Sequence, residues 1–140
     1  MPIYETKEDL KNEEIAKQYI RSIGYTPVKL KPEQSIDFAV CKGEDIMCLL
    51  EFKRRRCNSD KYETLMIHKR KHNAAIRYKK KMNLETILMV QYNDSLRACV
   101  FSQVSFTEGY GGRFDRNDPS DFEEVIYIKK EDLKEVEMGK

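Results

Sequence analysis

Two acidic residues and a lysine have the types and the spacing in this sequence that are best suited to chemistry. Asp37 is followed, after thirteen residues, by Glu51-Phe52-Lys53. Residues 51 and 53 lie two apart at the end of an apolar run, so on a strand their side chains leave the same face. If Asp37 lies on the neighbouring strand, the two carboxylates can approach each other. A divalent cation would stabilise such a pair, and carboxylate oxygens are the ligands that Mg²⁺ prefers.

A site of this kind is suited to the hydrolysis of phosphodiester bonds. A bound cation would offset phosphate charge and lower the pKa of a bound water. Lys53 would orient or deprotonate the attacking water and stabilise charge on the scissile phosphate. The backbone carbonyl of Phe52 is a candidate for a further metal ligand. The alternative for Asp37, Glu51 and Lys53 is a set of surface salt bridges on a half-exposed sheet.

Apolar periodicity predicts the elements that position these residues. Helical spacing indicates a helix from Thr6 or Asp9 to about Ile23. Alternation indicates strands over 25–31, 35–41 and 46–53, and a turn at 42–45 makes the last two a hairpin. Downstream we expect a helix from about Tyr62 to Met82, strands over 86–92, 96–101 and 125–128, a loop or insertion over 107–119, and a helical turn near Leu133.

This order of elements predicts an α/β fold in which a central mixed β-sheet is flanked by helices on both faces. A length of 140 residues is suited to one domain, which we place at residues 1–140. No apolar run is long enough to span a bilayer. Residues 1–9 have no apolar stretch of the kind found in a secretory signal. We therefore expect a protein that works inside a cell and has no membrane partner.

A dense basic segment follows the paired acids. Residues 53–81 contain twelve Lys or Arg against two acids, so they carry a charge of +10 while the rest of the chain carries −8. This asymmetry favours a nucleic-acid surface over a solvated lysine-rich helix. Arg54, Arg55 and Arg56 directly follow Lys53, where guanidinium groups would bind phosphates beside the scissile one.

The pattern around Asp37 and Glu51-Phe52-Lys53 resembles the PD-(D/E)XK nuclease superfamily, which includes restriction-endonuclease-like and Holliday-junction-resolvase-like proteins. Ile36 stands where the family name has Pro. The resemblance implies an αβββαβ core and cleavage of DNA with Mg²⁺, for which Mn²⁺ would substitute. It assigns catalysis to Asp37, Glu51 and Lys53.

The resemblance also implies further site residues. Members often add an acid from the first helix, for which Glu14 is our first choice and Glu13 the second. A residue of the basic helix often meets the phosphate, with Lys71 slightly ahead of Lys69. Gln91 resembles the polar residue that some members place near the metal. An ordinary surface role is the alternative for each of these residues.

Other residue types give weaker signals. The four cysteines lack any Cys-x-x-Cys spacing, which indicates free thiols and not a zinc site. His68 and His72 could share a metal on a helix, but their basic neighbours favour polar or phosphate-facing roles. One of several tyrosines could stack on a base, although tyrosine at the edge of the core is the usual case: Tyr62, Tyr78, Tyr92 and Tyr110.

The residues and the resemblance together predict an Mg²⁺-dependent endodeoxyribonuclease that acts on a DNA structure such as a junction, flap or nick, and the resemblance implies a homodimer. The high Lys, Asn and Ile content would suit a phage or viral gene. The alternative is a non-catalytic nucleic-acid-binding module that uses a basic helix over 61–81. A third hypothesis is a nuclease directed at RNA.

Overall fold

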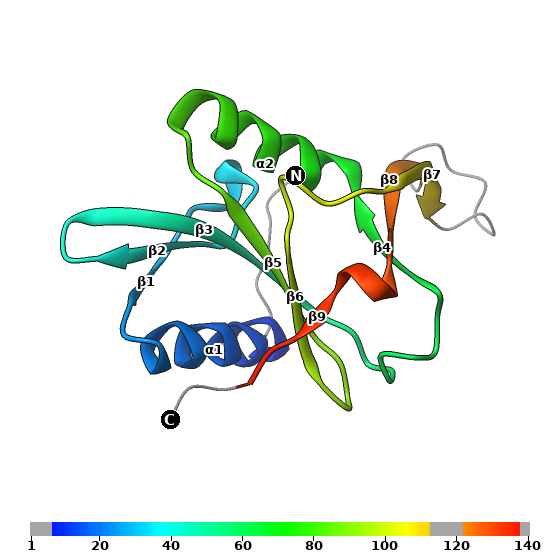
Figure 1. The fold of residues 1–140 in the computed structure, drawn as a ribbon, viewed down its shortest axis with the longest axis horizontal. Helices are drawn as coiled ribbons and strands as arrows, with labels where there is room; N and C mark the ends of the chain where they lie inside the picture. The colour runs from blue at the N-terminus through cyan, green and yellow to red at the C-terminus, as the bar shows by residue number, and fades with distance from the viewer. Residues whose placement is uncertain (1–6, 113–121, 138–140) are drawn as a thin grey trace.

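The computed structural model describes residues 7–112 and 122–137 (Figure 1). The first half of the chain contains α1 (Lys7–Ser22), β1 (Thr26–Lys29), a 3-10 turn (Pro32–Gln34), β2 (Phe38–Lys42), β3 (Asp45–Arg54) and β4 (Thr64–His68). The second half contains α2 (Lys69–Met82), β5 (Thr86–Gln91), β6 (Leu96–Val100), β7 (Thr107–Gly112), β8 (Phe122–Lys129), a second 3-10 turn (Lys130–Asp132) and β9 (Lys134–Glu135). The expected αβββαβ order is present, with β4 added before α2.

A six-stranded mixed sheet forms the centre of the molecule, in the order β1-β2-β3-β5-β6-β9. β3 and β5 pair in parallel, with Glu51 beside Leu88 and Lys53 beside Val90. The other pairs in this sheet are antiparallel. A parallel pair needs a crossover connection, which here passes through β4 and α2. The mixed sheet predicted from the sequence is thus confirmed.

The two helices cover opposite faces of this sheet (Figure 1). On one face, Ala16 and Ile20 of α1 pack in a buried cluster with Leu50, Phe52 and Met89. Gly24, with φ of 89°, turns the chain after α1 into β1. Leu50 and Phe52 point toward α1, so Glu51 and Lys53 must point to the opposite face, toward α2.

On that opposite face, α2 approaches the sheet through two small residues. Ala74 packs with Ile36, Ala39 and Leu49, and the side chains of Ala74 and Ala75 are fully buried. The helix ends at Asn83, whose φ of 54° is the left-handed conformation that asparagine tolerates at a helix C-terminus. The N-terminal turn of α2 therefore lies over the part of β3 that carries Glu51.

The predicted helix over 62–82 is wrong in its first third. Residues Thr64–His68 form β4, which pairs with β8 in a second, three-stranded sheet of order β4-β8-β7. Leu65 and Ile67 are buried against Ile126 and Ile128, while Thr64 and Met66 face outward. This alternation is a strand pattern, and burial of both leucine and isoleucine against β8 decides the conformation.

The C-terminal part also differs from the sequence-based expectation. Residues Thr107–Gly112, expected to be a loop, form β7 and pair with β8, whereas 113–121 lie outside the described residues. The helical turn near Leu133 is present as a 3-10 turn, and two-residue β9 was not expected. No helix in the described ranges combines the length and apolar content needed to cross a bilayer.

Candidate active site

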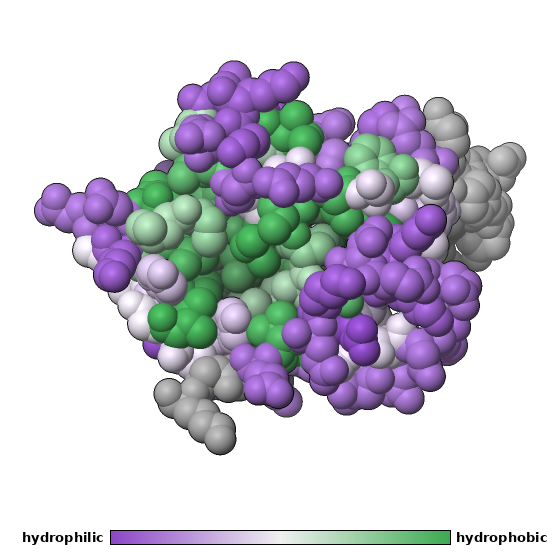
Figure 2. Space-filling model, viewed as in Figure 1, coloured by the Kyte–Doolittle hydropathy of each residue, from purple (hydrophilic) through white to green (hydrophobic). Residues whose placement is uncertain are grey.

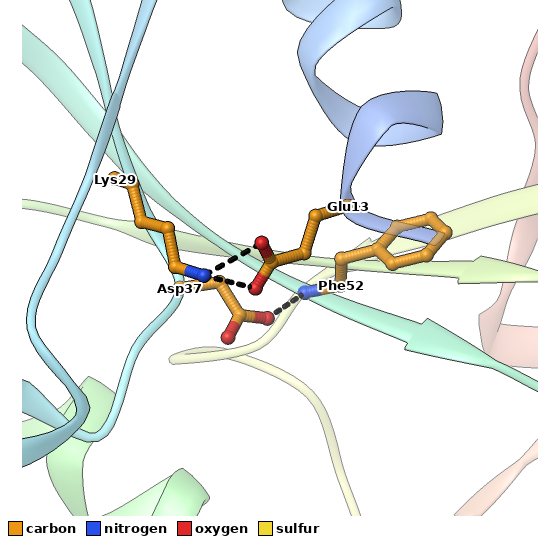
Figure 3. Close-up of polar contacts among 4 residues, drawn as sticks. All are labelled: Glu13, Lys29, Asp37 and Phe52. Carbon is orange, nitrogen blue, oxygen red and sulfur yellow. Dashed lines mark hydrogen bonds and ion pairs between the residues drawn. The ribbon is translucent and has the colours of Figure 1, made fainter. Parts of the chain in front are cut away.

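The register between β2 and β3 brings Asp37 and Glu51 to one place. Phe38 pairs with Leu50, so Asp37 stands opposite Glu51 one step beyond the last paired residues. There the backbone N–H of Phe52 donates a 2.8 Å hydrogen bond to Oδ2 of Asp37 (Figure 3). Residues opposite each other in an antiparallel pair point to the same face. The two carboxyl groups therefore share the face that α2 covers.

Glu51 is buried, with an exposed fraction of 6%. Its Oε2 lies 3.4 Å from Nζ of Lys71, while its Oε1 has no hydrogen-bond partner. Lys71 reaches this position because it lies three and four residues before Ala74 and Ala75, on the face of α2 that meets the sheet. A buried carboxylate oxygen without a donor is costly, and it indicates a site built for a further positively charged or donating group.

The surroundings of Glu51 and Lys53 shift the pKa values of both side chains toward neutral pH. Burial, followed by the neighbouring Asp37 carboxylate, raises the pKa of Glu51 to about 8, against the opposing effect of Lys71. Burial, followed by the Arg55 guanidinium, lowers the pKa of Lys53 to about 8, and the two carboxylates offset only part of this. Groups with such pKa values can gain or lose a proton near neutral pH, as general acids and bases must.

The donor set fits a hard divalent cation with several water ligands. Two carboxyl groups share one face, and Glu51 offers an unpartnered oxygen. Magnesium is usually bound by one or two carboxylates and keeps several waters. Within residues 7–112 and 122–137, no group of three or more His, Cys, Asp or Glu side chains is placed to hold a metal ion. The site could thus supply two carboxylates, with backbone or water oxygens as the other ligands.

On α1, Glu13 and not Glu14 is directed toward this region. The carboxylate of Glu13 accepts hydrogen bonds of 2.6 and 2.7 Å from Nζ of Lys29, and Figure 3 shows it pointing into the same space as the Asp37 carboxylate. Glu14 is 49% exposed and pairs instead with Arg21. The prediction for Glu14 is therefore not supported by the geometry.

The helical periodicity of α1 distinguishes Glu13 from Glu14. The buried residues Ala16 and Ile20 follow Glu13 by three and seven positions, so Glu13 lies on their face of α1. Lys29 was missed altogether, because nothing in the sequence relates position 29 to position 13.

Most of the predicted DNA-binding residues are already in contact with the protein itself. Arg54 donates to the carbonyl of Gln91 and to Asn93 Oδ1, both at 2.8 Å, and Arg55 donates to the carbonyl of Met66 at 2.6 Å. Lys69 pairs with Glu108 of β7 at 2.9 Å. Arg56 is exposed. Of the two helix lysines, only Lys71 faces Glu51.

Gln91 does not reach the site. In the parallel register it stands beside Arg54, so it lies on the face opposite Glu51 and Lys53. Its Nε2 donates to the backbone carbonyls of Tyr92 and Ser95, at 2.7 and 3.3 Å. The proposed role of Gln91 near a metal is therefore wrong in geometry, because period-two alternation places it on the wrong side of β5.

The two histidines do not form a shared site. His72 is buried between the rings of Phe101 and Phe106, with centroid distances of 5.2 and 4.5 Å. His68 ends β4, and its Nδ1 lies 2.8 Å from Oε2 of Glu123. The four cysteines are free thiols, as expected.

Comparison with known proteins agrees with this arrangement. The model of the family described as "Phage putative PDDEXK endonuclease" matches residues 1–136. Among solved structures, the chain is similar to Hjc, a Holliday junction resolvase from the archaeal hyperthermophile Archaeoglobus fulgidus, with a TM-score of 0.64 over 93% of each chain. The sequence identity is 10%, so this likeness concerns the fold. A search of curated proteins gives no match.

Proposed function

The chain belongs to the phage PD-(D/E)XK endonuclease family, and from that premise we propose that it is a divalent-metal-dependent endonuclease that hydrolyses phosphodiester bonds in DNA. The observation that carries the proposal is the convergence of Asp37 and buried Glu51 on one face, with Lys53 two residues further along the strand. We take residues 1–140 to be a single nuclease domain.

Each residue of the site has a role in this proposal. Asp37, Glu51 and the backbone carbonyl of Phe52 would hold Mg²⁺ or Mn²⁺, and Glu13 rather than Glu14 would contribute from α1 through a metal-bound water. The ion would offset phosphate charge and favour ionisation of a bound water. Lys53 with a free amine can accept a proton from the attacking water, and Lys53 as an ammonium stabilises the scissile phosphate. Lys71 holds Glu51 in place through its contact with Oε2.

We further propose that the substrate is a DNA structure such as a junction, flap or nick, and that the protein acts as a homodimer inside an infected cell. Support comes from the phage family and from a fold similar to that of a Holliday junction resolvase. A chain of 140 residues also has little surface for reading a long base sequence, whereas backbone shape can be read by few contacts. Paired cuts on a two-fold junction need paired sites.

The test is a panel of linear, nicked, flapped and four-way DNA substrates, incubated with Mg²⁺ or Mn²⁺ and, in parallel, with EDTA. We expect metal-dependent products, strongest on one of the structured substrates. Lys53→Ala should abolish cutting while binding in EDTA changes little. Metal-independent binding without any product would favour the nucleic-acid-binding module, and preferential cutting of matched RNA substrates would favour an RNA-directed nuclease.

A further inference from the structure

A pocket of about 460 Å³ lies at the end of β3, beside the proposed active site. Its walls come from the segment after β3, from β4, and from tyrosines on β8 and after β5. The residues that matter for its chemistry are Arg55, Arg56, Lys61, Tyr62, Tyr92 and Tyr127. The volume lies within the range of ordinary small-ligand pockets. None of the catalytic roles proposed above uses this pocket.

The pocket is held in shape by hydrogen bonds at both ends of its loop. The backbone N–H and Oγ of Ser59 donate to the two carboxylate oxygens of Asp94, at 2.8 and 2.9 Å. The N–H of Asn93 donates to the carbonyl of Cys57 at 3.0 Å. On the other side, Arg55 joins the end of β3 to Met66 of β4. A ligand would therefore enter a site that already exists.

The lining combines aromatic surface with positive charge. Tyr62 is 60% exposed, so one face of its ring is available, and Nζ of Lys61 lies 5.4 Å from the ring centroid. Tyr92 is almost fully buried and forms part of the deeper wall. Figure 2 shows hydrophilic side chains gathered at the lower right, where Figure 1 places the loop after β3. An aromatic face beside cations is the combination that binds an unstacked base and its phosphate.

The position of the pocket relates it to the proposed chemistry. Arg55 follows Lys53 by two residues, a distance of about 7 Å along an extended chain. A DNA strand whose phosphate lies at Lys53 would therefore pass the mouth of the pocket within about one nucleotide. Bases in an intact duplex are stacked and paired, so only an unpaired or displaced nucleotide can enter without an unstacking cost.

We propose that this pocket binds one unpaired nucleotide of the DNA strand, with its base stacked on Tyr62 and its phosphate facing Arg55, Arg56 and Lys61. This proposal rests on the proposed nuclease function, because that function makes DNA the molecule whose strand passes the pocket. It makes the pocket a specificity site, which favours DNA with an unpaired nucleotide next to the cut over fully paired duplex.

The test measures binding without cleavage. Lys53→Ala protein in EDTA is titrated with a duplex that carries one unpaired 2-aminopurine nucleotide, and with the same duplex fully paired. We expect tighter binding and fluorescence quenching with the unpaired nucleotide. Adding Tyr62→Ala should weaken that binding roughly 5- to 150-fold, the range for loss of one stacked base, and change paired-duplex binding less than about twofold. Tyr62→Phe, which keeps the ring, should stay within about twofold.

Equal loss of binding to both duplexes, or no loss to either, would overturn the pocket proposal. Because Tyr62 is largely exposed, Tyr62→Ala should retain the melting temperature of its parent, which is measured alongside. If the protein with Lys53 intact cuts no substrate but the binding difference is found, the nuclease proposal fails and the pocket stands. If it cuts DNA while Tyr62→Ala shows no selective effect, the pocket proposal alone fails.

Discussion

Glu51→Gln should stabilise the metal-free protein, increasingly so as the pH rises. Glu51 is buried, and its pKa is raised from about 4.5 to about 8 by burial first and by Asp37 second. Between these two values the folded protein binds a proton that the unfolded chain has released. Stability of the wild type therefore falls as the pH rises from 4.5 to 8. Glutamine has the same shape and no ionisation, so the variant escapes this loss.

The size of the effect follows from the shift in pKa. At about 1.36 kcal/mol per pH unit, a shift of this size makes the stabilisation by Glu51→Gln grow by on the order of 4 kcal/mol between pH 5 and pH 9. For a chain of this length, that corresponds to a difference of roughly 10 °C in melting temperature. The pH dependence contributed by Lys53, whose pKa is also about 8, is present in both proteins and largely cancels in the difference.

Urea unfolding of both proteins in EDTA, from pH 5 to pH 9, measures this difference directly. Glu63→Gln is the matched control, because the Glu63 side chain is 84% exposed and its replacement should change stability by less than about 0.5 kcal/mol at every pH. A Glu51→Gln difference that stays constant across the pH range would refute the reasoning. It would mean that Lys71 fully compensates the buried charge.

Three further predictions concern metal binding, stability and DNA affinity. Glu13→Gln should raise the Mg²⁺ concentration needed for half-maximal cleavage several-fold, whereas Glu14→Gln should leave it within about twofold; equal effects would contradict the assignment to α1. Gly109→Ala should lower the urea midpoint, because its Cβ would lie 2.8 Å from the Tyr127 ring and cost about 1–2 kcal/mol; an unchanged midpoint would show that the ring moves freely. DNA affinity, measured by fluorescence anisotropy, should fall with salt so that a plot of log affinity against log salt concentration has a slope no steeper than about −5. A slope near −11 would mean that all twelve Lys and Arg side chains of residues 53–81 contact phosphate.

The core of the site could be predicted because its information is local. Glu51 and Lys53 lie on β3, and Asp37 directly precedes β2, which begins at Phe38 and not at the predicted residue 35. A short turn joins β2 and β3, so the hairpin and period-two alternation suffice to bring the three residues together. The structure brings these residues together, and the N–H of Phe52 adds a hydrogen bond to Oδ2 of Asp37. The order of elements followed in the same way, from apolar periods and turn residues.

The remaining differences depend on contacts between distant segments. β4 has basic residues after it that suit a helix, and only pairing with β8, some 60 residues away, selects a strand for Thr64–His68. Gln91 was considered for the site from the resemblance alone. The parallel register of β3 and β5, which neither strand specifies by itself, places it beside Arg54 on the opposite face. Glu14 was preferred over Glu13 because it directly precedes Ile15. Ile15 is only partly buried, and the fully buried Ala16 and Ile20 define the inward face of α1.

The basic segment shows why a charge count overstates a binding surface. At least six of its twelve Lys and Arg side chains contact protein oxygens: Arg54, Arg55, Lys69, Arg70, Lys71 and Lys79. The acids that pair with the start of α2 come from β7 and β8, so the small sheet neutralises that end of the helix. Arg54 and Arg55 hold the end of β3 to the segments beside it. Much of the charge therefore holds the site together. The basic residues outside this set are Lys53 of the site itself, Arg56 and Lys61, which line the pocket, and Arg77, Lys80 and Lys81 in the C-terminal half of α2.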